Sequence, residues 1–134
     1  MPDGMEITLR KVRKPHEQQL NAQIKWLGDS LGLFSLRDKD SSCYRIFIEL
    51  VKSSKLQKPL SSDEMAYRLN LTRGTVVHHL NKLMKAGLVT KANNKYQLRQ
   101  NTLYHVVEDL EKDVQRLFDE IKAISKSIDE TIFS

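Results

Sequence analysis

The sequence predicts a mainly α-helical fold with one small β-hairpin, and three observations support this class. Residues 61–86 contain two short amphipathic helical patterns with a tight turn between them. Two β-favouring runs, 88–91 and 95–98, follow directly and flank the turn-forming residues 92–94. From Leu103 onward, apolar residues recur every three or four positions for nearly four heptads, which predicts one long helix.

The first of the two short helices has a strong start signal. Ser61 is a favourable N-cap residue, and Glu64 three positions later completes a capping box. Asn70 tolerates the left-handed backbone conformation that often ends a helix, so we place the turn at Asn70 and Leu71.

The second short helix begins after Thr72, another N-cap residue, and stops at Gly87, which is the preferred residue just beyond a helix C-terminus. The opposite sides of this helix differ in chemistry. Its apolar residues recur at helical spacing and predict the buried face, which consists of Val76, Leu80, Leu83 and Met84.

The outer face of the same helix is polar and basic, which suits a recognition helix in the major groove of double-stranded DNA. Arg73 lies in its first turn, the part that points at base edges in such motifs. A hairpin directly after a recognition helix is a wing, and Lys91 and Lys95 beside its tip would meet phosphates. The pattern therefore predicts a winged helix-turn-helix DNA-binding domain over residues 41–101.

The segment LTRGTVVHHLNKLMKAGLV resembles the recognition-helix signature of ArsR-like winged helix-turn-helix transcriptional regulators. The resemblance covers about residues 43–98 and includes the Thr-x-x-Thr-Val start, the His-Leu-x-x-Leu run and the Ala-Gly-Leu-Val exit. It implies a dimeric, sequence-specific DNA binder in which Arg73, Thr75, Val77 and His78 contact bases or nearby phosphates. Asn70 replaces the usual turn glycine, and the paired-cysteine box of the metal-sensing members is missing, so metal sensing is not implied.

Residue pattern and resemblance together give one set of predicted DNA-binding residues on the recognition helix and the wing. They are Thr72, Arg73, Thr75, Val77, His78, Asn81, Lys82, Lys85, Lys91, Asn93, Asn94 and Lys95.

The charge distribution supports this placement. Residues 41–101 hold eleven Lys and Arg against three Asp and Glu, a net charge of +8, although the whole chain carries only +5. Residues 102–134 hold four basic and eight acidic residues, a net charge of −4. Phosphates attract the first segment and repel the second, so we expect the C-terminal segment to point away from DNA.

The C-terminal segment, residues 102–134, is predicted to be a heptad-repeat dimerisation helix. Its apolar stripe is wider than a two-stranded seam, so we expect a second helix to cover it. That helix is predicted from about Pro15 to Leu31, within an N-terminal dimerisation helix and linker over residues 15–40. The alternative is that the long helix packs only within its own chain. The predicted homodimer interface comprises Leu20, Ile24, Leu27, Leu31, Leu103, Val107, Leu110, Val114, Leu117, Ile121, Ile124 and Ile128.

Residues 1–14 form a basic N-terminal arm whose role the sequence leaves open. Residues 5–9 have the composition of a short strand, and residues 10–14 are a basic cluster. The arm is either a solvated charged linker or a segment that reaches a DNA groove or phosphates.

Several function classes have no support in the sequence. Cys43 is the single cysteine, so it cannot form an internal disulfide, and we expect a buried core thiol. His78 and His79 are adjacent on a helix and point about 100° apart, so we predict no metal site. No catalytic or phosphate-binding motif is visible, so we expect no enzyme activity and no cofactor. The N-terminus lacks a secretory core and no apolar run approaches about 20 residues, so we expect a cytoplasmic protein without a membrane partner.

Three functions follow from these patterns. The leading one is a homodimeric transcriptional regulator with recognition helix 72–86 in the major groove and wing 88–98 on phosphates. The second is an architectural or segregation protein that binds DNA with low sequence specificity. The third is a winged-helix module that binds proteins instead of DNA. Whether a small-molecule effector acts on the chain stays open.

Overall fold

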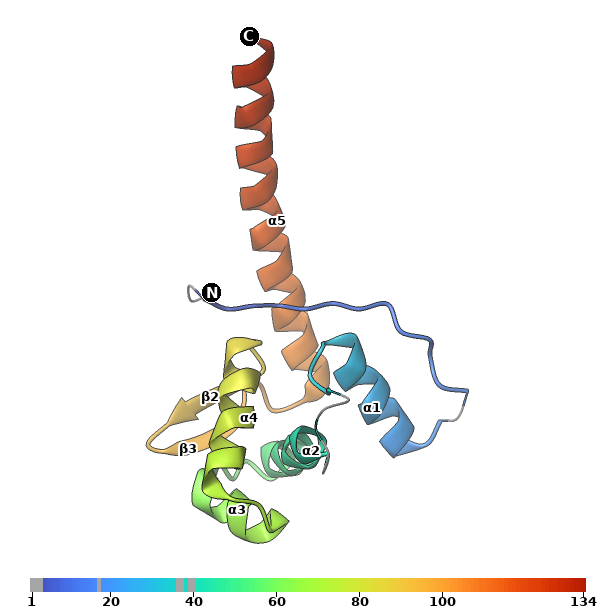
Figure 1. The fold of residues 1–134 in the computed structure, drawn as a ribbon, viewed down its shortest axis with the longest axis vertical. Coiled ribbons are helices and arrows are strands. Elements are labelled where there is room, and N and C mark those ends of the chain that lie inside the picture. Colours follow the sequence, from blue (N-terminus) through green and yellow to red (C-terminus); the bar gives the residue numbers. More distant parts are fainter. Residues whose placement is uncertain (1–3, 17, 36–37, 39–40) are drawn as a thin grey trace.

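The fold is a small helical domain with a three-stranded sheet at one side and a long helix that projects from it (Figure 1). The computed structural model describes residues 4–16, 18–35, 38 and 41–134. The predicted winged helix-turn-helix class is confirmed over these residues. The first three residues of the predicted arm, residue 17 of the predicted N-terminal helix, and residues 36–37 and 39–40 of the predicted linker lie outside the described residues.

Helix α2 (Ser42–Lys55) lies at the centre of the core. Asp38 caps its start, because the backbone N–H groups of Ser42 and Cys43 donate to the two carboxylate oxygens at 2.9 and 2.8 Å. Ile46, Phe47 and Leu50 are fully buried. Cys43 is buried beside them as expected, and this burial raises the pKa of its thiol to about 11. The thiol is therefore protonated at neutral pH and behaves as a small core side chain.

Helices α3 (Ser62–Leu69) and α4 (Arg73–Lys85) form the predicted helix-turn-helix. The capping box is confirmed, since Glu64 N donates to Ser61 Oγ at 3.0 Å and Ser61 N donates to Glu64 Oε1 at 3.2 Å. Asn70 takes the predicted left-handed conformation with φ of 54°. Asparagine has a short polar side chain that tolerates this conformation, so it can replace glycine at this turn.

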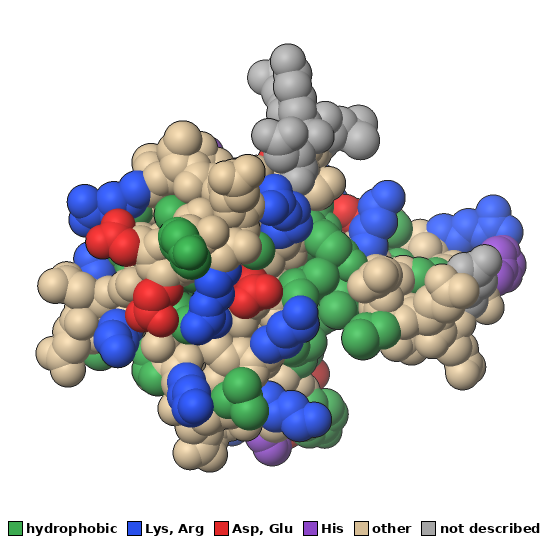
Figure 2. Space-filling view, turned by 90° about the horizontal axis from the view of Figure 1, so that it is seen from below, with side chains coloured by type: hydrophobic (Ala, Val, Ile, Leu, Met, Phe, Trp, Pro, Cys, Tyr) green, Lys and Arg blue, Asp and Glu red, His purple; other side chains and the backbone are tan. Residues whose placement is uncertain are grey.

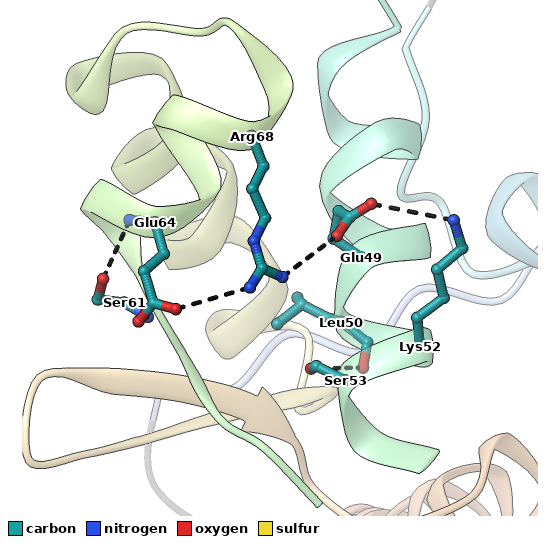
Figure 3. Close-up of polar contacts among 7 residues, drawn as sticks. All are labelled: Glu49, Leu50, Lys52, Ser53, Ser61, Glu64 and Arg68. Carbon is teal, nitrogen blue, oxygen red and sulfur yellow. Dashed lines mark hydrogen bonds and ion pairs between the residues drawn. The ribbon is translucent and has the colours of Figure 1, made fainter. Parts of the chain in front are cut away.

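A small polar network fixes α3 against α2 (Figure 3). The Arg68 guanidinium lies 3.9 Å from carboxylate oxygens of both Glu64 and Glu49, so it bridges the two helices. From the α2 side, Arg45 donates to the carbonyl of Leu69 at the end of α3. These contacts hold α3 at a fixed angle to α2, and α4 begins directly after α3.

The sheet has the order β1-β3-β2, with both pairs antiparallel. Strands β2 (Val89–Ala92) and β3 (Lys95–Leu98) are the predicted wing, shifted by one residue at the first strand. Asn93 and Asn94 both have positive φ, at 53° and 61°, which is the geometry of a tight two-residue hairpin turn. Strand β1 (Leu60–Ser61) was not predicted, because two residues are too few for an alternating pattern.

Helix α1 (Leu20–Ser30) is shorter than predicted and begins five residues after Pro15. Pro15 is therefore not in its first turn. Residues 15, 16, 18 and 19 are exposed, so no packing surface supports an extra helical turn there. Ile24 is buried, and Leu27 and Leu31 pack against the core of the same chain.

The arm, described from residue 4, is packed on the domain and forms no strand. Glu6 N donates to the carbonyl of Lys85 at 2.9 Å, and Arg10 N donates to the carbonyl of Ser30 at 2.7 Å. The indole N–H of Trp26 donates to the carbonyl of Val12 at 3.0 Å. The arm thus crosses from the end of α4 to α1, passing the lower part of α5 (Figure 1).

Helix α5 (Leu103–Phe133) begins at Thr102, whose hydroxyl accepts from His105 N at 3.2 Å. Its first half belongs to the core, since Val106 and Leu110 are buried and Leu103 packs against them. Its second half extends away from α3 and from the start of α4 (Figure 1). None of the helices in the described residues combines the length and the hydropathy that a membrane span requires.

Candidate nucleic-acid interface

The N-terminal half of α4 is exposed at the end of the molecule opposite to the projecting part of α5 (Figure 1). The hydroxyl of Thr72 accepts from Thr75 N at 3.2 Å, so this helix start is capped by its own side chain. Val76, Leu80 and Leu83 are fully buried and fix the inner face as predicted. Of the predicted contact residues in this part, Thr72, Arg73, His78 and Asn81 are exposed, and Thr75 and Val77 are half-buried.

Gly74 lies in the middle of this exposed start, and nothing in the fold requires a glycine there. Its φ is not positive, and a Cβ at this position would meet no other atom within 4 Å. Glycine in a helix costs about 0.5–1 kcal/mol relative to alanine. The missing side chain leaves the backbone of this exposed helix start open to close approach by a ligand.

The C-terminal half of α4 is engaged by the chain itself. Lys82 Nζ donates to the carbonyl of Leu33 at 2.7 Å, and Lys85 Nζ lies 3.2 Å from Glu6 Oε1. Sequence reasoning placed both lysines among the DNA contacts, because helical periodicity puts them on the polar face. The structure gives Lys82 a partner in the α1–α2 connection and Lys85 a partner in the arm, and Lys85 stays exposed.

The wing presents the second group of predicted contacts. Lys91, Asn93, Asn94 and Lys95 are all exposed on β2, β3 and their turn. The Lys91 ammonium lies 5.3 Å from the centre of the Tyr96 ring, a cation–π distance that orients the lysine on the wing surface. Seen from the α3 end, Lys and Arg side chains are spread over this face, with a few acidic side chains among them (Figure 2).

The position of the wing is fixed by a buried ion pair with α5. Arg99, just after β3, donates from Nη1 to Asp113 Oδ2 at 2.5 Å, and its Nε lies 3.4 Å from Asp109 Oδ2. This hydrogen bond from Arg99 holds the pKa of Asp113 below its usual value. Asp113 occupies a position that flanks the heptad stripe of α5, but it is fully buried within the single chain.

The histidines in the described part of the chain do not form a metal site. Burial lowers the pKa of His79, which keeps that ring neutral near pH 7, and His78 packs edge-on against it. The described residues contain no group of three or more His, Cys, Asp or Glu side chains that could hold a metal ion.

One residue of the face was missed by sequence reasoning. Asp63 on α3 lies 3.5 Å from Arg73, measured from its Oδ1 to the arginine Nε. The sequence offers one indication of its role. Residues 65–107 contain no Asp or Glu, so Asp63 and Glu64 are the acidic residues nearest to Arg73 in the chain. Glu64 is used by the capping box, which leaves Asp63 as the acidic group beside the start of α4.

Comparison with known families agrees with this geometry. The family model described as bacterial regulatory protein, arsR family, matches residues 54–91. This segment is similar to the helix-turn-helix domain of ArsR-family regulators. The match runs from the end of α2 through α3 and α4 into β2, the elements that build the exposed face. No curated protein and no solved structure gave a match.

The matched family is one of DNA-binding transcriptional regulators and not one of enzymes. The matched segment contains the whole of α4, the second helix of the helix-turn-helix.

Proposed function

We propose that this ArsR-family chain acts as a homodimer that reads a specific, pseudo-palindromic DNA site. The start of α4 enters the major groove and the wing contacts phosphates beside it. The observation that carries this proposal is the exposed, side-chain-capped start of α4, which presents Arg73 and the bare backbone of Gly74. Arginine is the commonest side chain for bidentate recognition of guanine in the major groove.

Dimerisation is supported by the second half of α5. Phe118, Ile121, Ile124 and Ile128 are each at least half exposed in the single chain. A helical segment of this length with no partner is marginal in water, and large exposed apolar stripes mark interaction surfaces. The stripe continues the side that the domain buries in the first half, since Leu103, Leu110, Leu117 and Ile124 follow one another at steps of seven.

In this proposal, the second half of α5 packs against the same segment of a second copy of the chain. Of the residues predicted for the interface, those in the second half of α5 form it in this proposal. Ile24 and Leu110 are instead buried in the core of each protomer. Two-fold symmetry would place two copies of α4 about 34 Å apart, one turn of DNA.

The decisive experiment is selection of binding sites from random duplex DNA with the full chain, combined with sedimentation at micromolar concentration. A dimer that enriches a motif with two related half-sites supports the proposal. A specific site should be bound roughly 10³-fold or more tightly than random duplex. A chain that binds all duplexes within a factor of a few is an architectural protein instead, and a monomer refutes the dimeric mode.

A further inference from the structure

Asp63 and Arg73 form an ion pair that crosses from α3 to the first residue of α4. Both side chains are largely exposed, at 77% and 72% of their surface. An exposed pair of this kind contributes little to folding because water screens it. A carboxylate beside a phosphate-binding surface also opposes DNA, so Asp63 does not serve general affinity for DNA.

The geometry of the pair leaves the recognition end of Arg73 free. The carboxylate Oδ1 faces Nε at 3.5 Å, which is the atom nearest the aliphatic stem. The two terminal nitrogens of a guanidinium are the ones that contact O6 and N7 of guanine together. A carboxylate at Nε therefore restrains the long side chain without occupying its two terminal nitrogens.

The same carboxylate disfavours the competing use of Arg73. A phosphate oxygen that approached the guanidinium from the α3 side would meet the negative charge of Asp63. The edge of a guanine presents acceptor atoms with only partial negative charge, so this repulsion is weaker there. Asp63 thereby shifts Arg73 from phosphate binding, which carries no sequence information, towards a base edge.

We propose that Asp63 is a positioning residue that commits Arg73 to reading a guanine, an inference that rests on the proposed function. Asp63 does not touch the base. It acts through Arg73, lowers the general affinity of the domain for DNA and raises its preference for one base pair.

The experiment compares the wild-type chain with Asp63→Asn, Arg73→Ala and the double variant. Each is measured by site selection from random duplexes and by competition between the selected site and its variant without the guanine. We expect wild type to prefer the guanine about tenfold or more. Asp63→Asn should lose most of that preference and bind random duplex several-fold more tightly. In the Arg73→Ala background, Asp63→Asn should no longer change base preference.

A purely structural role of Asp63 predicts a different pattern. Asp63 lies in the first turn of α3, where an acidic residue favours the helix dipole. Loss of that role would lower the melting temperature equally in both backgrounds and leave base preference unchanged. That outcome, or an unchanged guanine preference in Asp63→Asn, overturns the proposal. A wild-type chain without any sequence preference overturns the proposed function itself, and the two failures are therefore distinguishable.

Discussion

The clearest test of the exposed helix start is Gly74→Ala, because the structure predicts opposite effects on folding and on DNA binding. The added methyl group meets no atom within 4 Å, and the backbone is already helical. Alanine should therefore stabilise the fold by about 0.5–1 kcal/mol. For a chain of this size, that corresponds to a melting temperature higher by about 2–4 °C.

The effect on DNA has the other sign. If a base edge or sugar lies against this backbone, the methyl group is forced into a packed contact, which costs about 1–3 kcal/mol. The dissociation constant for the selected site should then rise about five- to 150-fold, since 1.4 kcal/mol is a factor of ten. Thermal melting and fluorescence anisotropy with a labelled duplex measure the two quantities on the same preparation.

A matched control separates close contact from a general effect of a stiffer helix. Ser127→Ala also improves helix propensity at an exposed position, but on the projecting part of α5. It should raise the melting temperature without changing DNA affinity. If Gly74→Ala binds the selected duplex as tightly as wild type does, DNA does not approach this backbone and the reasoning is refuted.

Three further predictions address the wing, the dimer and the buried ion pair. Lys91→Ala or Lys95→Ala should weaken binding to all duplexes alike and reduce the salt slope by about one, as read from anisotropy titrations at several salt concentrations. Ile121→Asp should convert a sedimenting dimer to a monomer while the circular dichroism spectrum of the winged domain persists; a dimer that survives contradicts the proposed seam. Asp113→Asn should destabilise the fold by about 3 kcal/mol. Because the folded-state pKa of Asp113 is lowered, its stabilisation is complete above the usual value near 4 and is lost as pH falls through the lower value, so urea midpoints of wild type should fall in acid more steeply than those of the variant.

Local signals predicted the helix-turn-helix well because each of its boundaries is set by one or two neighbouring residues. Ser61, Asn70, Thr72 and Gly87 all have the cap or turn geometry that their residue types favour. The same logic placed the wing, where two asparagines in sequence supply the positive φ angles of the hairpin turn. Such interactions act within four residues of the chain, so their outcome depends little on the rest of the fold.

Contacts between distant segments could not be predicted in this way. Periodicity identified Lys82 and Lys85 as polar-face residues of α4, but it could not show that the arm and the α1–α2 connection occupy them. Likewise, Asp113 flanks the heptad stripe of α5, and only the tertiary fold brings Arg99 to it. Apolar residues of the heptad pattern pack in the core of the domain along the first half of α5. Along the second half, such residues are exposed in the single chain.

These long-range contacts converge on the C-terminal end of α4, opposite to the end that we propose for DNA contact. Gly87 has φ of +81°, and a Cβ there would lie 2.8 Å from Met5 and 3.3 Å from Leu110, so the arm, α4 and α5 meet at one tightly packed point. The wing is joined to the same part of α5 through Arg99 and Asp113. Both α4 and the wing are therefore attached to the buried first half of the helix whose second half we propose as the dimer contact. In the proposed dimer, a rotation of one α5 relative to its partner would change the distance between the two α4 helices, and DNA half-site spacing would then depend on how the α5 helices pair.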